Sequence, residues 1–144
     1  MNDKTHTLNE LIEITRDGER FYRHALSEVK SPELLQVFEE MAQVKSAVIQ
    51  ALAVKVSANE EHPAQGGTLF GRFREAYADA RAGMASDKDA TYVAQLEATE
   101  DRILAAYEDA LKDADVDVQA LLGLELPKLR ACQARMSALK KSLA

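Results

Sequence analysis

Hydrophobic side chains recur with helical spacing in four long stretches of the sequence. In each stretch they fall at intervals of three and four residues, which places them on one face of an α-helix. Start signals support this interpretation, since Thr7 and Glu10 form a capping-box pattern and Ser31 directly precedes a proline. The pattern predicts helices over about residues 7–29, 32–56, 88–112 and 116–143.

The connections between these stretches differ in length, and this difference sets the order of the helices. Short turns near residues 30 and 114 predict two antiparallel hairpins. The segment 57–87 contains a shorter helical pattern over about 69–81 and is long enough to traverse a helix of about 37 Å. We therefore expect one all-α domain over residues 1–144, a four-helix bundle of two antiparallel hairpins with a long crossover that carries a short extra helix. The third long helix should lie beside the second and parallel to it, which is typical of the ferritin-like arrangement.

Two of the predicted apolar stripes have a charged residue at their centre. Glu100 lies in the middle of the stripe of the third long helix, and Lys45 holds the same place in the second. A buried charge needs a partner because its desolvation is costly, so we expect Lys45 to meet Glu100, Glu19 or both inside the bundle. A lysine at this place also suits a side chain that extends its ammonium to the rim of the bundle.

Other polar residues lie at similar heights along the helices. Glu19 shares the apolar face of the first helix, although it also suits a surface position at the margin of that face. Glu97 lies at the edge of the third stripe, and Glu125 interrupts the last one. The predicted buried polar layer consists of Glu19, Lys45, Glu97, Glu100 and Gln133.

Composition narrows the classes of function. The 144 residues carry a net charge of −6, which argues against a nucleic-acid partner because phosphate binding requires a basic surface. The single cysteine, Cys132, cannot form an internal disulfide, and no apolar run approaches the ~20 residues that span a bilayer. We expect a cytoplasmic protein with no nucleic-acid and no membrane partner.

The order of the helices, the chain length and several local patterns are similar to one protein family. The patterns are Asp17-Gly18-Glu19 in the first helix, and Leu96-Glu97-Ala98-Thr99-Glu100-Asp101 with Tyr107 in the third. The chain resembles a bacterial ferritin-like four-helix-bundle family known only as a domain of unknown function, with rubrerythrins and ferritins as more distant relatives. The resemblance implies a di-iron or di-manganese site with one Glu from each of two helices and Glu-x-x-His from each of the other two.

The residues of this chain match the implied metal site only in part. Glu19 and either Glu100 or Glu97 suit the two single-glutamate positions. At the matching heights, however, the second and fourth long helices offer Ala42-Gln43-Val44-Lys45 and Arg130-Ala131-Cys132-Gln133, and neither contains Glu-x-x-His. The site that the resemblance implies is therefore degenerate.

The three histidines do not complete the metal site. His6 precedes the first helix, His62 lies in the crossover, and His24 is turned away from the Glu19 face, so each is expected to be solvated. We therefore expect a binding, assembly or stress-related protein with no catalytic residues and no cofactor. The alternative is a rubrerythrin-like di-metal carboxylate oxidase or peroxidase that binds iron or manganese through Glu19, Glu97, Glu100 and Glu125.

The crossover helix suggests an interface. Its aromatic residues Phe70, Phe73 and Tyr77 need to be covered, and the bundle can cover only one face of the helix. Because closed twofold association is the commonest way to bury such a surface, we expect a homodimer that uses this helix. The sequence does not identify any other partner protein.

Overall fold

The computed structural model describes residues 3–59, 61–68, 77–83 and 87–143. Its long helices are α1 (Asp3–Leu26), α2 (Pro32–Ala58), α4 (Lys88–Lys112) and α5 (Val116–Ser142). A further helical segment in the crossover covers residues 77–83 and is called helix 77–83 below. Because the described residues contain helices and no strand, the predicted all-α bundle is confirmed.

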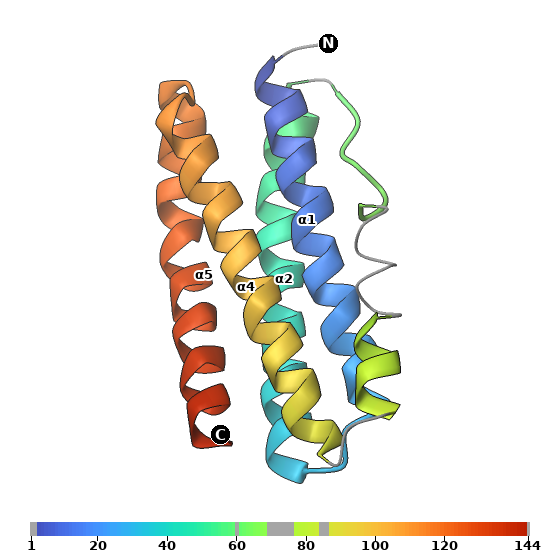
Figure 1. The fold of residues 1–144 in the computed structure, drawn as a ribbon. Helices are drawn as coiled ribbons and strands as arrows, with labels where there is room; N and C mark the ends of the chain where they lie inside the picture. The colour runs from blue at the N-terminus through green and yellow to red at the C-terminus, as the bar shows by residue number, and fades with distance from the viewer. Residues whose placement is uncertain (1–2, 60, 69–76, 84–86, 144) are drawn as a thin grey trace.

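The four long helices form two antiparallel hairpins. Figure 1 shows α2 returning beside α1, the described crossover residues 61–68 and 77–83 lying beside α1, and α4 and α5 forming the second hairpin. α1 packs against α2 and α4, whereas α5 packs mainly against α4. α4 is parallel to α2, as predicted, but it lies diagonally across the bundle from α2 and not beside it. The described parts of the crossover account for this difference, because residues 61–68 and Asp79 contact α1 and so place the start of α4 on the α1 side of the bundle.

The helix boundaries agree closely with the sequence signals, with one exception. Ser31 and Asp87 cap α2 and α4 by accepting hydrogen bonds from backbone amides three residues later. α1 begins at Asp3, before the capping-box pattern. Lys4 stabilises this extra turn, since its ammonium lies 2.8 Å from the carboxylate of Asp117 on α5.

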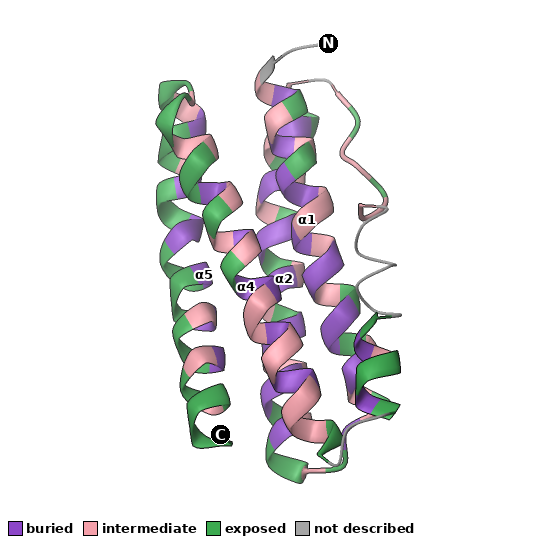
Figure 2. Cartoon of the chain, viewed as in Figure 1, coloured by how far each residue is buried: buried purple, intermediate pink, exposed green. Residues whose placement is uncertain are grey.

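The hydrophobic core consists of two clusters, one toward each end of the bundle. The cluster near the turn between α1 and α2 contains Phe21, Phe38 and Leu96, and the other contains Leu8 and Leu52. Buried residues face inward on all four helices, and the outer faces are exposed (Figure 2). None of the described helices is both long and apolar enough to cross a membrane.

Polar side chains on the outer face of α1 hold the first part of the crossover. The amide group of Asn9 donates to the carbonyl of His62 at 3.2 Å and accepts from the backbone amide of Ala64 at 2.7 Å. About two turns further along α1, the guanidinium of Arg16 donates to the backbone carbonyl of Ala64 at 2.8 Å and to that of Gly66 at 3.1 Å. These contacts satisfy backbone groups that a segment without regular secondary structure leaves unpaired.

Asp17 provides the last of these attachments. Its carboxylate accepts a hydrogen bond from the backbone amide of Thr68 at 2.8 Å and another from the Thr68 hydroxyl. The neighbouring Gly67 suits this close approach, because a Cβ atom at that position would crowd the Asp17 carboxylate. Asp17 therefore fixes the crossover at the point where it passes the middle of α1.

Asp17→Ala should release the crossover from α1. It removes two charge-assisted hydrogen bonds and leaves a backbone amide without its acceptor, so we expect a loss of about 1–2 kcal/mol in the free energy of unfolding. Urea denaturation and limited proteolysis within residues 61–68 measure the effect. The matched control is Asp109→Ala, which changes a carboxylate that is 84% exposed on α4. Equal stability and equal proteolysis of the two variants would contradict this role of Asp17.

Candidate functional site

The centre of the bundle contains a buried ion pair. The Lys45 ammonium on α2 lies 2.7 Å from the Oε2 atom of Glu100 on α4, and both side chains are 0% exposed. Since α2 and α4 are diagonal neighbours, the pair crosses the middle of the bundle. It lies between the two hydrophobic clusters and belongs to neither. The predicted contact between Lys45 and Glu100 is therefore present, and Lys45 does not extend to the rim.

Tyr22 of α1 is the third member of this site. Its hydroxyl donates to the same Oε2 atom of Glu100 that accepts from Lys45, and the Lys45 ammonium lies 5.6 Å from the centre of the Tyr22 ring. Burial, followed by the Glu100 carboxylate, raises the pKa of Tyr22 well above its usual value. Tyr22 is therefore a neutral hydrogen-bond donor at neutral pH. The other oxygen of Glu100, Oε1, is buried without a hydrogen-bond partner among the described residues.

Gly18 makes room for this arrangement where α1 meets α4. A Cβ atom at position 18 would lie 2.7 Å from the Cδ1 atom of Ile103 and 3.7 Å from Cε of Lys45. The absent side chain thus allows α4 to approach α1 and lets the stem of Lys45 pass between them. Gly18 and Tyr22 are the two residues that sequence reasoning did not assign to the site. Gly18 could have been found from the sequence, because a glycine in the apolar face of a long helix often marks a place where another element packs closely.

The fourth helix contributes Cys132. This residue is 2% exposed, and burial raises the pKa of its thiol, which the nearby Lys45 ammonium partly offsets. Each of the four long helices therefore contributes one side chain to the central layer, namely Tyr22, Lys45, Glu100 and Cys132. The raised pKa makes the Cys132 thiol a weak nucleophile at neutral pH.

Two glutamates of the predicted layer lie at its margin. The Glu19 side chain is 19% exposed and its carboxylate lies 3.5 Å from the guanidinium of Arg23, one turn along α1. The Glu97 side chain is 14% exposed and its carboxylate lies 3.8 Å from the ammonium of Lys140 on α5. Glu19 precedes Tyr22 by three residues, and Glu97 precedes Glu100 by three. Three helical steps of about 100° fall short of a full turn by about 60°, so each glutamate is rotated by that angle from the residue in the layer. That rotation is enough to bring a carboxylate to the margin of the bundle.

Gln133 and Glu125 are also outside the central layer. Gln133 follows Cys132 by one residue, a rotation of about 100° around α5, and therefore lies at the surface between α4 and α5. It is half-buried, and its amide donates a hydrogen bond to the Asp101 carboxylate at 2.9 Å. Glu125 is buried, yet both of its oxygens accept from the Lys128 ammonium, at 3.1 and 3.3 Å. A solvent-facing lysine one turn away therefore satisfies this carboxylate.

The alternative ligand set is not assembled in the described part of the chain. Glu19, Glu97, Glu100 and Glu125 each contact a different cation, and no three of them bring ligand atoms within reach of one ion. A di-metal centre requires four carboxylates and two histidines that converge on one place. Among the described residues, Glu100 is the carboxylate that contacts side chains of other helices at the centre of the bundle.

The interface candidates fall in the crossover. Phe70 and Phe73 lie outside the described residues. Tyr77 is 52% exposed, and its hydroxyl accepts a hydrogen bond from Arg81 at 3.2 Å. The other face of helix 77–83 packs against the bundle through Ala78 and Ala82, which are buried.

These features define an all-α helical-bundle protein with a buried Lys–Glu–Tyr site. The family model described as "Domain of unknown function (DUF2383)" matches residues 3–113, and the chain belongs to this family. No curated protein matches the sequence.

One solved structure has a similar fold. Its description is "YcfI, a putative structural protein from Rhodopseudomonas palustris", its sequence is 19% identical, and its TM-score to this chain is 0.78. The alignment covers 92% of this chain and 88% of that one. At this level of identity the similarity shows a shared fold.

Lys45→Ala should destabilise the protein strongly, since it leaves the Glu100 carboxylate buried and unpaired. We expect a loss on the order of 3 kcal/mol or more in the free energy of unfolding. The triple variant Tyr22→Phe, Lys45→Met, Glu100→Leu replaces every polar member of the site by an apolar group of similar size and should recover most of that loss. Chemical denaturation measures both effects.

The matched control for Lys45→Ala is Lys112→Ala on α4, whose side chain is 75% exposed. This variant should unfold at the denaturant midpoint of the parent. If Lys45→Ala did so as well, the buried pair would not stabilise the bundle.

Proposed function

We propose that the chain is a ferritin-like bundle protein in which the Lys45–Glu100 pair takes the place of a di-metal centre. It acts through binding or assembly and not through oxygen chemistry. The observation that carries this proposal is the 2.7 Å contact between a fully buried ammonium and the carboxylate in the middle of the bundle. The compartment proposed for this activity is the cytoplasm.

The arrangement of the helices supports the ferritin-like assignment. Two antiparallel hairpins, a long connection between them and inward-pointing residues from all four long helices are the features that di-metal carboxylate proteins use to build their centres. In those proteins the central residues are glutamates and histidines. In this chain the corresponding layer holds Tyr22, Lys45 and Cys132 around a single glutamate, Glu100.

Electrostatics argues against a metal ion at this place. The Lys45 ammonium already contacts Oε2 of Glu100, and a divalent cation at either oxygen would bring two positive charges to one buried carboxylate, where they would repel each other. Lys45 has no other acidic partner within reach among the described residues. Metal binding would therefore leave a buried ammonium uncompensated, which is strongly unfavourable.

The similar solved structure is compatible with this proposal. Its printed description is that of a structural protein, and its fold is shared over most of both chains. Because the ion pair fills the place where a metal ion would bind in the interior, the outer surface of the bundle is the part of the protein that we propose contacts a partner.

Metal analysis tests the proposal at the interior site. The parent protein and the triple variant Tyr22→Phe, Lys45→Met, Glu100→Leu are purified from cells grown with added iron and manganese. We expect the same metal content per chain in both, because Glu100 holds no ion. About two iron or manganese ions per chain in the parent, lost from the triple variant, would instead establish the oxidase or peroxidase alternative.

The assembly we propose is a homodimer that uses the crossover helix, on the basis of the exposed Tyr77 and the position of Phe70 and Phe73 in the sequence. Light scattering coupled to size exclusion should give twice the chain mass at micromolar concentration, and Tyr77→Asp should lower it toward that of one chain. The control is Val54→Asp, which changes a valine that is 67% exposed on α2. If the measured mass were that of one chain at every concentration, the proposed homodimer would be contradicted.

A further inference from the structure

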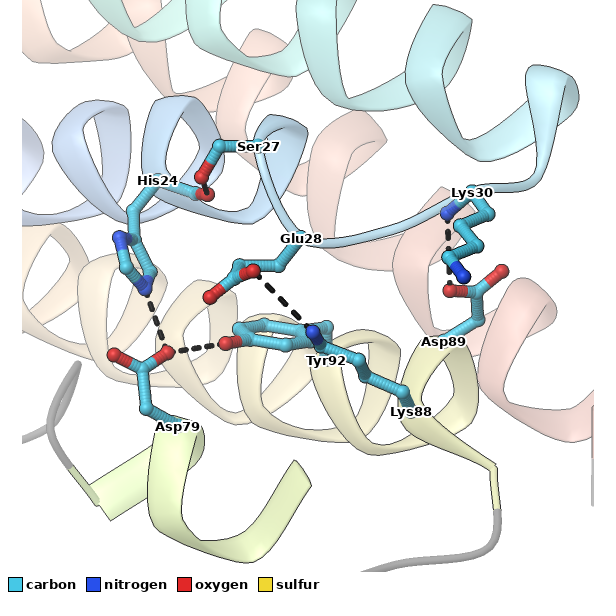
Figure 3. A network of polar contacts seen from close by, with 8 residues as sticks. All are labelled: His24, Ser27, Glu28, Lys30, Asp79, Lys88, Asp89 and Tyr92. Carbon is cyan, nitrogen blue, oxygen red and sulfur yellow. Dashed lines mark hydrogen bonds and ion pairs between the residues drawn. The ribbon is translucent and has the colours of Figure 1, made fainter. Parts of the chain in front are cut away.

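A second polar cluster lies at the end of the bundle where α1 ends and α4 begins. His24 of α1, Glu28 in the turn after it, and Asp79 of helix 77–83 bring one ligand atom each to within 4.8 Å of one another. Figure 3 shows His24 and Glu28 turned toward helix 77–83 and Asp79 pointing back at them. In the described part of the chain this is the group of three whose donor atoms are close enough to bind one ion.

The sequence reasoning expected His24 to be solvated, and the structure corrects this. The His24 side chain is 30% exposed, and its Nε2 atom lies 2.6 Å from Oδ1 of Asp79. The Tyr92 hydroxyl donates to the same Asp79 oxygen. The crossover supplies Asp79 from a position 55 residues away in sequence, so no local motif announced the cluster.

The Asp79 carboxylate is held in place by two neighbouring side chains. Although burial raises the pKa of Asp79, the contacts with His24 and Tyr92 outweigh it and keep this pKa below its usual value. The Tyr92 hydroxyl donates to the Asp79 oxygen that faces His24, and such an outer-shell hydrogen bond orients a ligating carboxylate. Because Ala78 and Ala82 pack into the core, helix 77–83 has a defined position relative to α1.

We propose that His24, Glu28 and Asp79 form a binding site for a divalent transition-metal ion, and that zinc suits the donor set best. One imidazole nitrogen and two carboxylate oxygens, with a fourth position left for water, are ligands that zinc accepts. Donor atoms around one tetrahedral zinc ion lie about 3.3 Å apart, given bond lengths near 2.0–2.1 Å. The three atoms reach such spacing by small side-chain rotations. The bound ion ties the crossover to the end of α1.

A neighbouring lysine competes with the ion. The Lys88 ammonium lies 3.3 Å from Oε2 of Glu28, and its side chain is 44% exposed. Such a lysine can turn into solvent at small cost when a cation binds to Glu28. Its removal should therefore strengthen metal binding, whereas removal of a ligand should weaken it.

The test uses the full chain, freed of metal with a chelator, and titrated with Zn²⁺ by calorimetry and with Co²⁺ by visible absorption. We expect one ion per chain, and the Kd should rise at least about tenfold in both His24→Ala and Asp79→Asn. In Lys88→Gln the Kd should fall a few-fold. Zinc should also raise the melting temperature of the parent and leave that of His24→Ala unchanged.

The chain offers a matched control at the other end of α1. His6 and Glu10 form an exposed histidine–glutamate pair with 2.5 Å between Nε2 and Oε1, and no third ligand atom joins them among the described residues. His6→Ala should leave the Kd unchanged. If the parent, His24→Ala and Asp79→Asn bound zinc equally, or if folded parent protein bound none, the cluster would be a hydrogen-bonded contact alone and the proposal would be overturned.

This inference is independent of the proposed function. An ion at the end of the bundle is lost with His24 or Asp79, whereas an ion in the interior would be lost with Glu100. Zinc bound by the parent and by the interior triple variant, but not by His24→Ala, would support both proposals. If bound metal were lost from the variant that lacks Glu100, the proposed function would be contradicted. The zinc titration of His24→Ala would still test the site at the end of the bundle separately.

Discussion

The ion pair between Lys45 and Glu100 is the constraint on which the packing of the four long helices depends. It joins α2 to α4 across the diagonal of the bundle, where the backbones are too far apart for close packing. The pair needs the two helices at matching heights, because a shift of one residue along either helix would turn its charge out of the interior. Gly18 and Tyr22 then follow as requirements, the first for space beside the stem of Lys45 and the second as the additional donor to Glu100.

Much of the fold follows from the sequence because the information is local. The four helices, their caps and the long crossover each leave a pattern within a few residues, and two opposite charges at the centres of apolar stripes have few ways to be satisfied other than by each other. The rest depends on rotations and long-range contacts. Glu19 and Glu97 differ from buried positions by only part of a helical turn, and Tyr22 in an apolar stripe is indistinguishable from an ordinary core tyrosine.

The crossover shows where such reasoning from the sequence ends. Its contacts with α1 involve the polar residues Asn9, Arg16 and Asp17, which on their own indicate a solvated helix face. Only the folded chain shows that these side chains bind backbone groups about 50 residues away. The same segment then delivers Asp79 to His24 and Tyr92. One connection thus accounts both for the parallel course of α2 and α4 and for the polar cluster at the end of the bundle.

The two clusters differ in what surrounds their carboxylates, and this difference decides which of them can accept a cation. Glu100 is closed off from water and already carries a cation from its own chain, so an ion would have to enter a site whose charge is balanced. Glu28 and Asp79 are partly exposed, and Lys88 beside Glu28 is free to move into solvent. A buried pair of this kind adds less to stability than its short distance suggests, because the desolvation of both charges offsets most of their attraction. An arrangement of the helices that separated Lys45 from Glu100 would leave a charge unpaired in the interior, and this cost disfavours it.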